Sequence, residues 1–197
     1  MKILFQGDSI TDCGRDRSDS HNLSGYTAMV AAKLGKQHEY VNLGESGNRS
    51  ADVLARYDAD IKAVAPDIMT LLIGINDVWR RFDRNAYTSP AAFEANLRRI
   101  CEKFKADFPQ AKLVLLEPFT VPAADKGHWR RDLIEIIDVV RALAKEFADG
   151  FVPLDGLFAK AAMTADYAAL SPDGVHPDVA GQELIADALS EELKRFL

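Results

Sequence analysis

A serine near the start of the chain and a histidine near its end have the residue types that a nucleophile and its base require. Ser9 stands directly after the apolar segment Ile3–Gln6 and the pair Gly7-Asp8. An apolar segment that ends in glycine and a small polar residue is typical of a buried strand that presents a side chain at the edge of a sheet. His176 follows Asp173 by three residues, and a histidine base needs such a carboxylate to orient it. These residues predict nucleophilic catalysis by a serine.

The elements that must position these side chains alternate between strands and helices. Strand-like segments occur at five places: Ile3–Gln6, Glu39–Leu43, Ile68–Ile73, Leu113–Glu117 and Phe151–Leu154. Segments with helical period lie between them. Alternation of this kind favours a parallel sheet that is covered by helices on both faces.

Apolar spacing predicts three of the helices in particular. One follows Ser89 and Pro90, a suitable N-cap and first-turn proline, and another is capped by Asp178. The apolar positions that define the three are Phe93, Leu97, Ile100 and Phe104, then Leu133, Ile136, Ile137, Val140, Ala144 and Phe147, then Leu184, Ile185, Ala188, Leu189, Leu193 and Phe196. We expect each of these stripes to face the protein core.

The bulk composition describes an acidic globular protein. The chain has 197 residues, 48% of them hydrophobic and 27% charged, with a net charge of −6. We expect a single domain, residues 1–197, with no basic excess that would hold nucleic acid. A strand-like run begins directly after Met1 and Lys2, and no stretch approaches the roughly 20 apolar residues of a membrane span. We therefore expect a cytoplasmic location and no membrane partner.

Five connecting segments are the expected location of a site. In an open sheet of this class, ligands bind outside the carboxyl ends of the strands. The segments that follow those ends are Gly7–Gly25, Gly44–Ser50, Gly74–Ser89, Pro118–Arg131 and the stretch Asp173–Pro177. The two cysteines, Cys13 and Cys101, are too few for a disulfide framework and lack the spacing of a zinc site. We expect Cys101 to be a packing residue.

Four short motifs occur in these segments in a fixed order. They are Gly7-Asp8-Ser9, Glu45-Ser46-Gly47-Asn48, Gly74-Ile75-Asn76-Asp77 and Asp173-Gly174-Val175-His176-Pro177. Together they resemble the GDSL or SGNH hydrolase family, whose signature residues are a serine, a glycine, an asparagine and a histidine. The resemblance implies a three-layer α/β/α sandwich with a flavodoxin-like, parallel five-stranded sheet. It also implies ester hydrolysis through a serine acyl-enzyme, without a metal or cofactor.

The resemblance assigns a role to each signature residue. Ser9 attacks the ester carbonyl, His176 accepts and returns its proton, and Asp173 orients the imidazole. The oxyanion formed by this attack needs hydrogen-bond donors. The family pattern supplies the backbone N–H groups of Ser9 and Gly47 and the side-chain amide of Asn76. A glycine permits close approach to the substrate, and an amide donates without adding a titrating charge.

Each residue also has a structural interpretation when it is taken alone. Ser9 has the type of a helix N-cap, Gly7 and Gly47 suit turns, and Asn76 is an ordinary turn former. A lone His176 is more often structural than catalytic. The occurrence of all of them in order, each with the chemical type that its role demands, favours the catalytic interpretation.

Two rival sites receive less support. Ser46 nearly fits the G-x-S-x-G elbow of larger α/β hydrolases, but Asn48 stands where the final glycine is required. Asp8 and Asp12 suggest a phosphatase of the haloacid-dehalogenase type, which needs a carboxylate nucleophile in D-x-D spacing and magnesium. Ser9 and Ile10 break that spacing.

Within the family, the sequence resembles intracellular carbohydrate acetyl esterases of the xylan-deacetylating kind. The agreement runs from Gly7 to Arg15 and from Ile73 to Arg80, and more loosely through Pro118-Phe119 and Arg130-Arg131. It implies an acetylated saccharide as the small-molecule partner, and a homo-oligomer. The expected substrate-binding residues are Asp8, Trp79, Arg80, Trp129 and Arg130, with the tryptophans stacking on sugar rings. The other interpretation of both tryptophans is that they are partly buried loop anchors or subunit contacts.

Two other functions remain open at this point. A thioesterase or lysophospholipase of the same family would act on longer acyl chains through the same residues. A carbohydrate-binding protein could have the fold without the activity, although every motif residue is intact.

Overall fold

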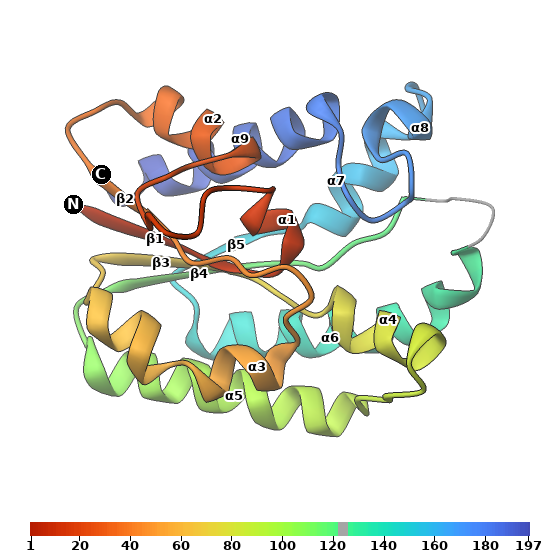
Figure 1. Ribbon diagram of the computed structural model, residues 1–197, viewed down its shortest axis with the longest axis horizontal. Helices are drawn as coiled ribbons and strands as arrows, with labels where there is room; N and C mark the ends of the chain where they lie inside the picture. Colours follow the sequence, from red (N-terminus) through yellow and green to blue (C-terminus); the bar gives the residue numbers. More distant parts are fainter. Residues whose placement is uncertain (122–125) are drawn as a thin grey trace.

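A five-stranded parallel sheet lies between two layers of helices in the computed structural model, which describes residues 1–121 and 126–197 (Figure 1). The strand order is β2-β1-β3-β4-β5. The strands are β1 (Lys2–Gly7), β2 (Glu39–Asn42), β3 (Ile68–Leu72), β4 (Lys112–Leu116) and β5 (Gly150–Val152). Every pair of neighbours is parallel. The predicted three-layer α/β/α sandwich with a flavodoxin-like sheet is confirmed.

The central strands are apolar on both faces because helices cover both. All five residues of β3 are buried, and so are the last five of β1. Ile3 pairs with Ile68 across β1 and β3, and Met69 pairs with Leu113 across β3 and β4. A strand buried on both faces has no polar side to alternate with. The core therefore lies on either side of the sheet.

The helices divide between the two faces of the sheet (Figure 1). On one face lie α1 (Ser9–Asp12), α2 (Gly25–Leu34), α7 (Leu154–Ala161), α8 (Tyr167–Leu170) and α9 (Val179–Lys194). On the other lie α3 (Ser50–Ala55), α4 (Ile75–Asp83), α5 (Pro90–Asp107) and α6 (Arg130–Phe147). Two short turns, η1 (Asp58–Lys62) and η2 (Gly127–Trp129), join this second layer.

The three helices predicted from apolar spacing are confirmed. Ser89 caps α5 by accepting a hydrogen bond from the Ala92 N–H at 3.2 Å, with Pro90 in the first turn. Asp178 caps α9, and the apolar stripe of α6 is buried. Such caps satisfy N–H groups that have no partner inside the helix.

Two elements differ from the sequence prediction. The segment after β3 was expected to be a loop, but residues 75–83 form α4, which begins after Gly74 at a φ of 128°. Trp79 and Arg80 therefore lie on a helix. The last strand ends at Val152, earlier than predicted, because Pro153 has no N–H for the sheet ladder and precedes α7.

The sheet order places the first and third strands side by side with their helices on opposite faces. α1 follows β1 into one layer, whereas α4 follows β3 into the other (Figure 1). Such a point, where the connections from two neighbouring strands run to opposite faces of the sheet, is where sheets of this class bind ligands. The segments that begin at Gly7 and Gly74 meet there.

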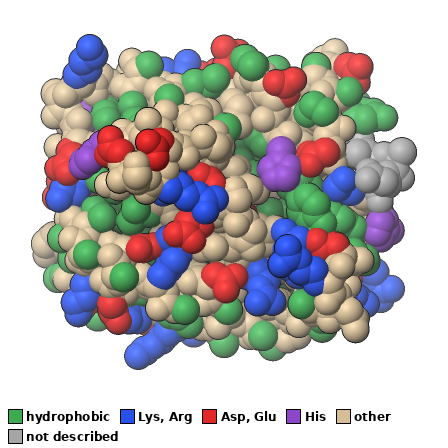
Figure 2. All heavy atoms as spheres, viewed as in Figure 1, with side chains coloured by type: hydrophobic (Ala, Val, Ile, Leu, Met, Phe, Trp, Pro, Cys, Tyr) green, Lys and Arg blue, Asp and Glu red, His purple; other side chains and the backbone are tan. Residues whose placement is uncertain are grey.

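Several other expectations concern the surface and the long segment Pro118–Arg131. Residues 122–125 of that segment lie outside the described residues. Within residues 1–121 and 126–197, no helix is long and apolar enough to cross a membrane. Cys101 is buried in the core, as predicted. The face shown in Figure 2 has acidic and basic side chains interspersed.

The aromatic pair Phe119 and Phe158 tests how far the core depends on packing between α7 and the segment that follows β4. Their rings stack with centroids 3.8 Å apart, and both are fully buried. We expect Phe158→Ala to lower the free energy of unfolding by about 3–5 kcal/mol in urea titrations, because it leaves a cavity. The control is Met163→Ala, at a side chain that is 82% exposed, where we expect a change below about 0.5 kcal/mol. Equal effects of the two variants would contradict this description of the core.

Candidate active site

Ser9 and His176 come together although 167 positions separate them in the chain. The Ser9 Oγ lies 2.9 Å from the His176 Nε2. Ser9 is the first residue of α1, directly after β1, and Asp8 caps this short helix by accepting a hydrogen bond from the Ile10 N–H. The hydroxyl is therefore displayed at the carboxyl edge of the sheet, within hydrogen-bond distance of a base.

Asp173 holds the other side of the imidazole. Its Oδ2 lies 2.8 Å from the His176 Nδ1, and its Oδ1 accepts hydrogen bonds from the backbone N–H groups of His176 and Val175. Partial burial opposes ionisation, but these hydrogen bonds outweigh it and hold the pKa of Asp173 below its ordinary value. A carboxylate that stays ionised can orient the imidazole and stabilise its cationic form.

The loop that contains Asp173 and His176 is fixed from both sides. The Gly174 carbonyl accepts a hydrogen bond from the Val121 N–H at 2.8 Å, and the Ser171 Oγ donates to the His176 carbonyl at 2.9 Å. On α9, Gln182 donates from its Nε2 to the Pro177 carbonyl. These contacts set the position of the imidazole relative to α1.

Gly47 lies in the loop between β2 and α3, with space beside it. Its φ is 88°, in the left-handed region that favours glycine. A Cβ added there would meet no atom within 4 Å. The neighbouring residues contact both helices that follow the central strands: Ser46 contacts Asp12 of α1, and the Asn48 carbonyl accepts from Asn76 of α4.

Asn76 is oriented by contacts at both ends of its amide. Its Nδ2 donates to the Asn48 carbonyl at 3.1 Å, and its Oδ1 accepts from the Arg80 Nη2 at 2.9 Å. Because the guanidinium can only donate, the oxygen of the amide faces Arg80 and the nitrogen faces the loop that contains Gly47. An amide nitrogen has two N–H groups, so one remains beside the hydrogen bond to Asn48.

The two tryptophans expected to bind substrate have different surroundings. Trp79 is half-buried, and its ring centroid lies 5.8 Å from that of His176. Trp129 is only 4% exposed and packs against Trp79 and, in a stacked arrangement, against Phe82. The expectation that Trp129 stacks on a sugar is wrong in this conformation, because other aromatic rings cover it. It matches the alternative interpretation as a buried anchor.

Three further residues expected to bind substrate are engaged by other parts of the protein. Asp8 is fully buried beneath the site. Arg80 forms an ion pair with Asp83 and donates to Asn76. Arg130 makes a two-point ion pair with Asp155. Burial removes the Asp8 carboxylate from the surface. A guanidinium has five N–H donors, so these contacts leave donors over on Arg80 and Arg130, and their role in substrate binding stays a prediction.

The rival nucleophile and the phosphatase hypothesis find no supporting geometry. The Ser46 Oγ donates to the Asp12 carboxylate at 2.5 Å, so its proton faces an acid rather than a histidine. Asp12 is itself ion-paired with Arg17. In residues 1–121 and 126–197 no three acidic, histidine or cysteine side chains are grouped as a metal site would require.

Sequence reasoning missed the residues that support the site. Arg56 donates from its Nε to the Asn48 Oδ1 and from its Nη2 to the Leu43 carbonyl, both at 2.8 Å. Gln182 also accepts from the Tyr26 N–H, which joins α9 to α2. Buried polar residues near a motif would have been the signal for them, because a buried polar group needs a partner.

The assembled groups can perform acyl transfer. A hydroxyl, an imidazole and a carboxylate form a continuous hydrogen-bonded series from Ser9 to Asp173. The loop that contains Gly47 contacts the helix of Ser9 through Ser46 and Asp12, and the Asn76 amide contacts the same loop at Asn48. This arrangement has the nucleophile, the base and the neutral donors that a tetrahedral oxyanion requires.

Comparisons with known proteins agree with this chemistry. A model of the GDSL-like lipase/acylhydrolase family matches residues 5–184. An acetylxylan esterase from Geobacillus stearothermophilus is 35% identical, over 98% of this chain and 93% of that protein. The esterase TesA of Pseudomonas aeruginosa is 28% identical, over 99% of this chain and 89% of that protein.

Solved structures give the same result for the fold. The structure of the Geobacillus acetylxylan esterase superposes with a TM-score of 0.86, covering 98% of this chain and 93% of the other. A protein assigned as a GDSL-like lipase from Parabacteroides merdae, 35% identical, superposes with a TM-score of 0.91, covering 98% of this chain and 95% of the other. The whole sheet and both helix layers are therefore shared.

The buried Asp8 predicts an unusual dependence of stability on pH. Burial raises its pKa from 3.8 to about 7, with a smaller contribution from the charge of Asp77, and its Oδ2 has no partner among the described residues. Between about pH 4 and pH 7, the Asp8 carboxyl group of the unfolded chain loses its proton, whereas that of the folded chain keeps it. The contribution of Asp8 to the free energy of unfolding therefore falls as pH rises from about 4 to about 7.

We expect Asp8→Asn to remove this penalty, since an amide keeps the hydrogen bond to Ile10 but does not ionise. At pH 8 the variant should be more stable than the natural protein by up to about 4 kcal/mol, whereas at pH 4 the two should be nearly equal. Urea unfolding at the two pH values measures this. A stability difference that is the same at both would contradict it.

Proposed function

The chain belongs to the GDSL-like lipase/acylhydrolase family and is a carboxylic ester hydrolase, and we propose that it removes acetyl groups from oligosaccharides with Ser9 as its nucleophile. The observation that supports this most directly is the series of contacts from the Ser9 Oγ through His176 to Asp173, at 2.9 and 2.8 Å. Two structures of the Geobacillus acetylxylan esterase are of catalytic mutants, with a serine or a histidine replaced by alanine.

In the first half-reaction, the Ser9 oxygen bonds to the carbonyl carbon of the ester. The hydroxyl proton moves to the His176 Nε2, which lies within hydrogen-bond distance, and Asp173 stabilises the imidazolium. The carbonyl oxygen becomes an oxyanion, which accepts hydrogen bonds from the Ser9 and Gly47 backbone N–H groups and the Asn76 amide. Each such donor contributes about 3 kcal/mol in the transition state.

The intermediate then collapses to an acyl-enzyme. The bond from carbon to the sugar oxygen breaks, and His176 gives its proton to that oxygen as the alcohol leaves. In the second half-reaction a water attacks the acetyl carbon while His176 accepts its proton. The bond to the Ser9 oxygen breaks, the proton returns to Ser9, and acetate leaves. The cycle uses no metal or cofactor.

The substrate class is supported by the relatives and by the aromatic ring beside the base. The Geobacillus relative is an acetylxylan esterase, and another of its structures is described as that of an acetyl-xylooligosaccharide esterase. Trp79 presents a half-buried ring near His176, and such a ring can pack against the apolar face of a sugar. Trp79 is therefore the one residue of the expected stacking pair that we retain.

Three expectations from the sequence belong to this proposal. They are the single domain formed by residues 1–197, the cytoplasmic location and the assembly of a homo-oligomer. The thioesterase alternative receives less support, because the thioesterase 1/protease 1/lysophospholipase L1 of Escherichia coli is 28% identical whereas the acetylxylan esterase is 35% identical.

Replacement of the nucleophile is the first test. We expect Ser9→Ala to fold normally and to lose hydrolysis of p-nitrophenyl acetate by at least about 10³-fold, because no other hydroxyl of the described residues contacts the His176 imidazole. The matched control is Ser18→Ala, at an exposed serine whose hydroxyl donates to the Asp16 carboxylate at 2.7 Å. Retention of most activity in Ser9→Ala would refute the assignment.

A series of acyl chain lengths tests the acetyl preference. We expect kcat/KM for p-nitrophenyl esters to fall by at least about tenfold between acetate and octanoate, since a rigid aromatic side chain beside the base limits the space for a long chain. Trp79→Ala should reduce this preference. Faster hydrolysis of chains of eight or more carbons by the natural protein would favour the thioesterase or lysophospholipase alternative.

A further inference from the structure

Two aspartates hold the loop that contains Gly47 in the same way. This loop, the Gly47 loop, comprises residues 44–50. At its start, Ser46 donates to Asp12 from both its backbone N–H and its hydroxyl. At its end, Ser50 donates to Asp77 from the same two groups. Asp12 is on α1 with Ser9, and Asp77 is on α4 next to Asn76.

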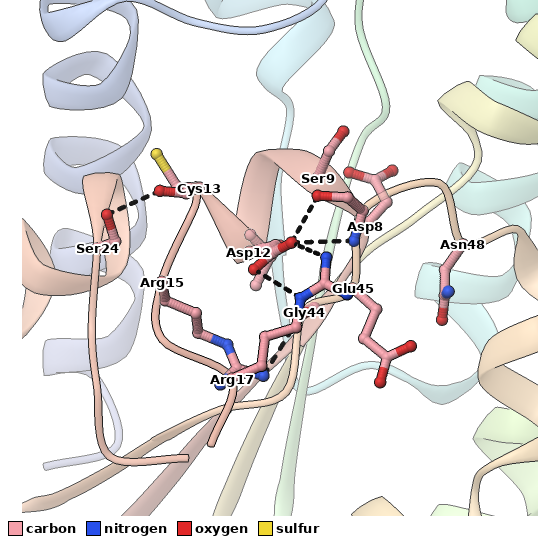
Figure 3. Close-up of polar contacts among 12 residues, drawn as sticks. Asp8, Ser9, Asp12, Cys13, Arg15, Arg17, Ser24, Gly44, Glu45 and Asn48 are labelled. Carbon is pink, nitrogen blue, oxygen red and sulfur yellow. Dashed lines mark hydrogen bonds and ion pairs between the residues drawn. The ribbon is translucent and has the colours of Figure 1, made fainter. Parts of the chain in front are cut away.

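The Asp12 contact is buried and charged. The Asp12 side chain is 2% exposed; its Oδ2 accepts from the Ser46 N–H at 3.1 Å and from the Ser46 Oγ at 2.5 Å. Arg17 donates to both carboxylate oxygens. Figure 3 shows the Asp12 carboxylate beside the Arg17 guanidinium, with dashed lines that mark their contacts. Although burial opposes ionisation, the hydrogen bonds from Arg17 and Ser46 lower the pKa of Asp12.

The Asp77 contact lies deeper and on the opposite side of the Gly47 loop. Its Oδ2 accepts from the Ser50 N–H at 2.9 Å, and its Oδ1 accepts from the Ser50 Oγ at 2.7 Å. The Ser50 Oγ also accepts a hydrogen bond from the Asn96 Nδ2 on α5. Asp77 and Ser50 are both fully buried, so their contact fixes the end of the loop against the second helix layer.

The backbone of the loop also packs closely against α1. A Cβ added to Gly44 would lie 2.5 Å from the Asp12 nitrogen and 2.8 Å from the Thr11 carbonyl carbon. The Glu45 N–H donates to the Gly7 carbonyl at 3.1 Å. Gly47 is thus one of the three residues between two anchored serines, one fixed to the helix of Ser9 and one to the helix of Asn76.

This arrangement matters because the proposed oxyanion donors belong to three separate segments. Ser9, Gly47 and Asn76 are on α1, the Gly47 loop and α4, and their N–H groups must all lie about 3 Å from one oxygen position. A misplacement of about 1 Å can cost about 10²-fold in rate. The two serine contacts connect the middle segment to both of the others.

We propose that Asp12 and Asp77 are positioning residues, which hold the Gly47 backbone N–H in place relative to the Ser9 N–H and the Asn76 amide. The inference deepens the proposed function and rests on it. Neither aspartate contacts the substrate; each acts on the reaction through a serine of the Gly47 loop. An aspartate suits this role because its oxygens accept several hydrogen bonds at once, whereas asparagine has a single acceptor oxygen.

Asp12→Ala gives the clearest test, because Asp12 is less deeply embedded than Asp77. With p-nitrophenyl acetate, and with active sites counted by a fluorophosphonate probe, we expect kcat per labelled site to fall by about 30-fold or more, and KM to change by less than about threefold. The midpoint of the pH profile of kcat/KM should not move, since the contacts of Asp173 and His176 are unchanged.

Asp149→Ala is the matched control. Asp149 also accepts hydrogen bonds from a cation, Lys105, and from a backbone N–H, that of Leu113, at 2.5 and 2.9 Å. These contacts lie at the start of β4, the opposite edge of the sheet from Ser9. We expect Asp149→Ala to lower the thermal midpoint of unfolding while kcat per labelled site stays within about twofold of the natural value.

A milder pair of variants keeps the test decisive if Asp12→Ala folds poorly. Ser46→Ala removes one of the two donors to Asp12, so we expect a loss of about three- to tenfold in kcat. Asp12→Asn should lower kcat more than Ser46→Ala does, because the amide group of asparagine would place N–H donors against the donors of Arg17 or Ser46. Addition of Ser46→Ala to Asp12→Asn should cause little further loss, since both changes disrupt one contact.

The possible results separate this inference from the function on which it rests. A kcat per labelled site within threefold of the natural value in Asp12→Ala or Asp12→Asn would overturn it, as would an equal loss in Asp149→Ala. Independent, multiplying effects of Asp12→Asn and Ser46→Ala would also overturn it. Failure of the probe to label Ser9 in the natural protein would instead overturn the proposed function.

Discussion

The parallel order of the five strands is the constraint on which the site depends. Because every strand runs in the same direction, the segments that leave their carboxyl ends lie along one edge of the sheet. The order β2-β1-β3 places the segments after these three strands next to one another, and they contain Ser9, Gly47 and Asn76. The return of the chain to the same edge before α9 brings His176 within 2.9 Å of Ser9. One reversed strand would separate these groups by the length of the sheet.

Four aspartates around this edge show how position decides the chemistry of one residue type. Hydrogen bonds outweigh partial burial at Asp173 and Asp12 and lower the pKa of each carboxyl group. Burial dominates at Asp8 and Asp77 and raises the pKa values to about 7 and about 6, despite hydrogen bonds from Ile10 and Ser50. The first pair stays charged and orients a histidine and a loop. Asp8 and Asp77 hold the backbone N–H groups of Ile10 and Ser50, although burial of their carboxyl groups costs desolvation free energy.

The sequence was sufficient to predict the sheet, three of the helices and the Ser9, His176 and Asp173 group. Apolar runs and helix caps are local features of the sequence. Ser9, Asp173 and His176 occur in short motifs, so they can be identified from the sequence as well. The nine-residue helix α4 was not predicted because its exposed side is rich in arginine and its N-cap residue is a glycine, Gly74. The burial of Trp129 arises from contacts between segments, and the hydrogen bond of Arg80 with Asn76 joins two residues four apart on α4, the helix that was not predicted. Residue type alone does not show such contacts, so both residues were expected to face the substrate.

The central claim is that three donors from three segments surround one oxygen next to Ser9. A crystal structure of the protein inhibited by a fluorophosphonate tests it most directly, because the phosphonyl oxygen occupies the place of the oxyanion. We expect phosphorus bonded to the Ser9 Oγ and the phosphonyl oxygen about 3 Å from the nitrogens of Ser9, Gly47 and Asn76 Nδ2. A phosphonyl oxygen directed to solvent, with Gly47 and Asn76 turned away from it, would contradict the account.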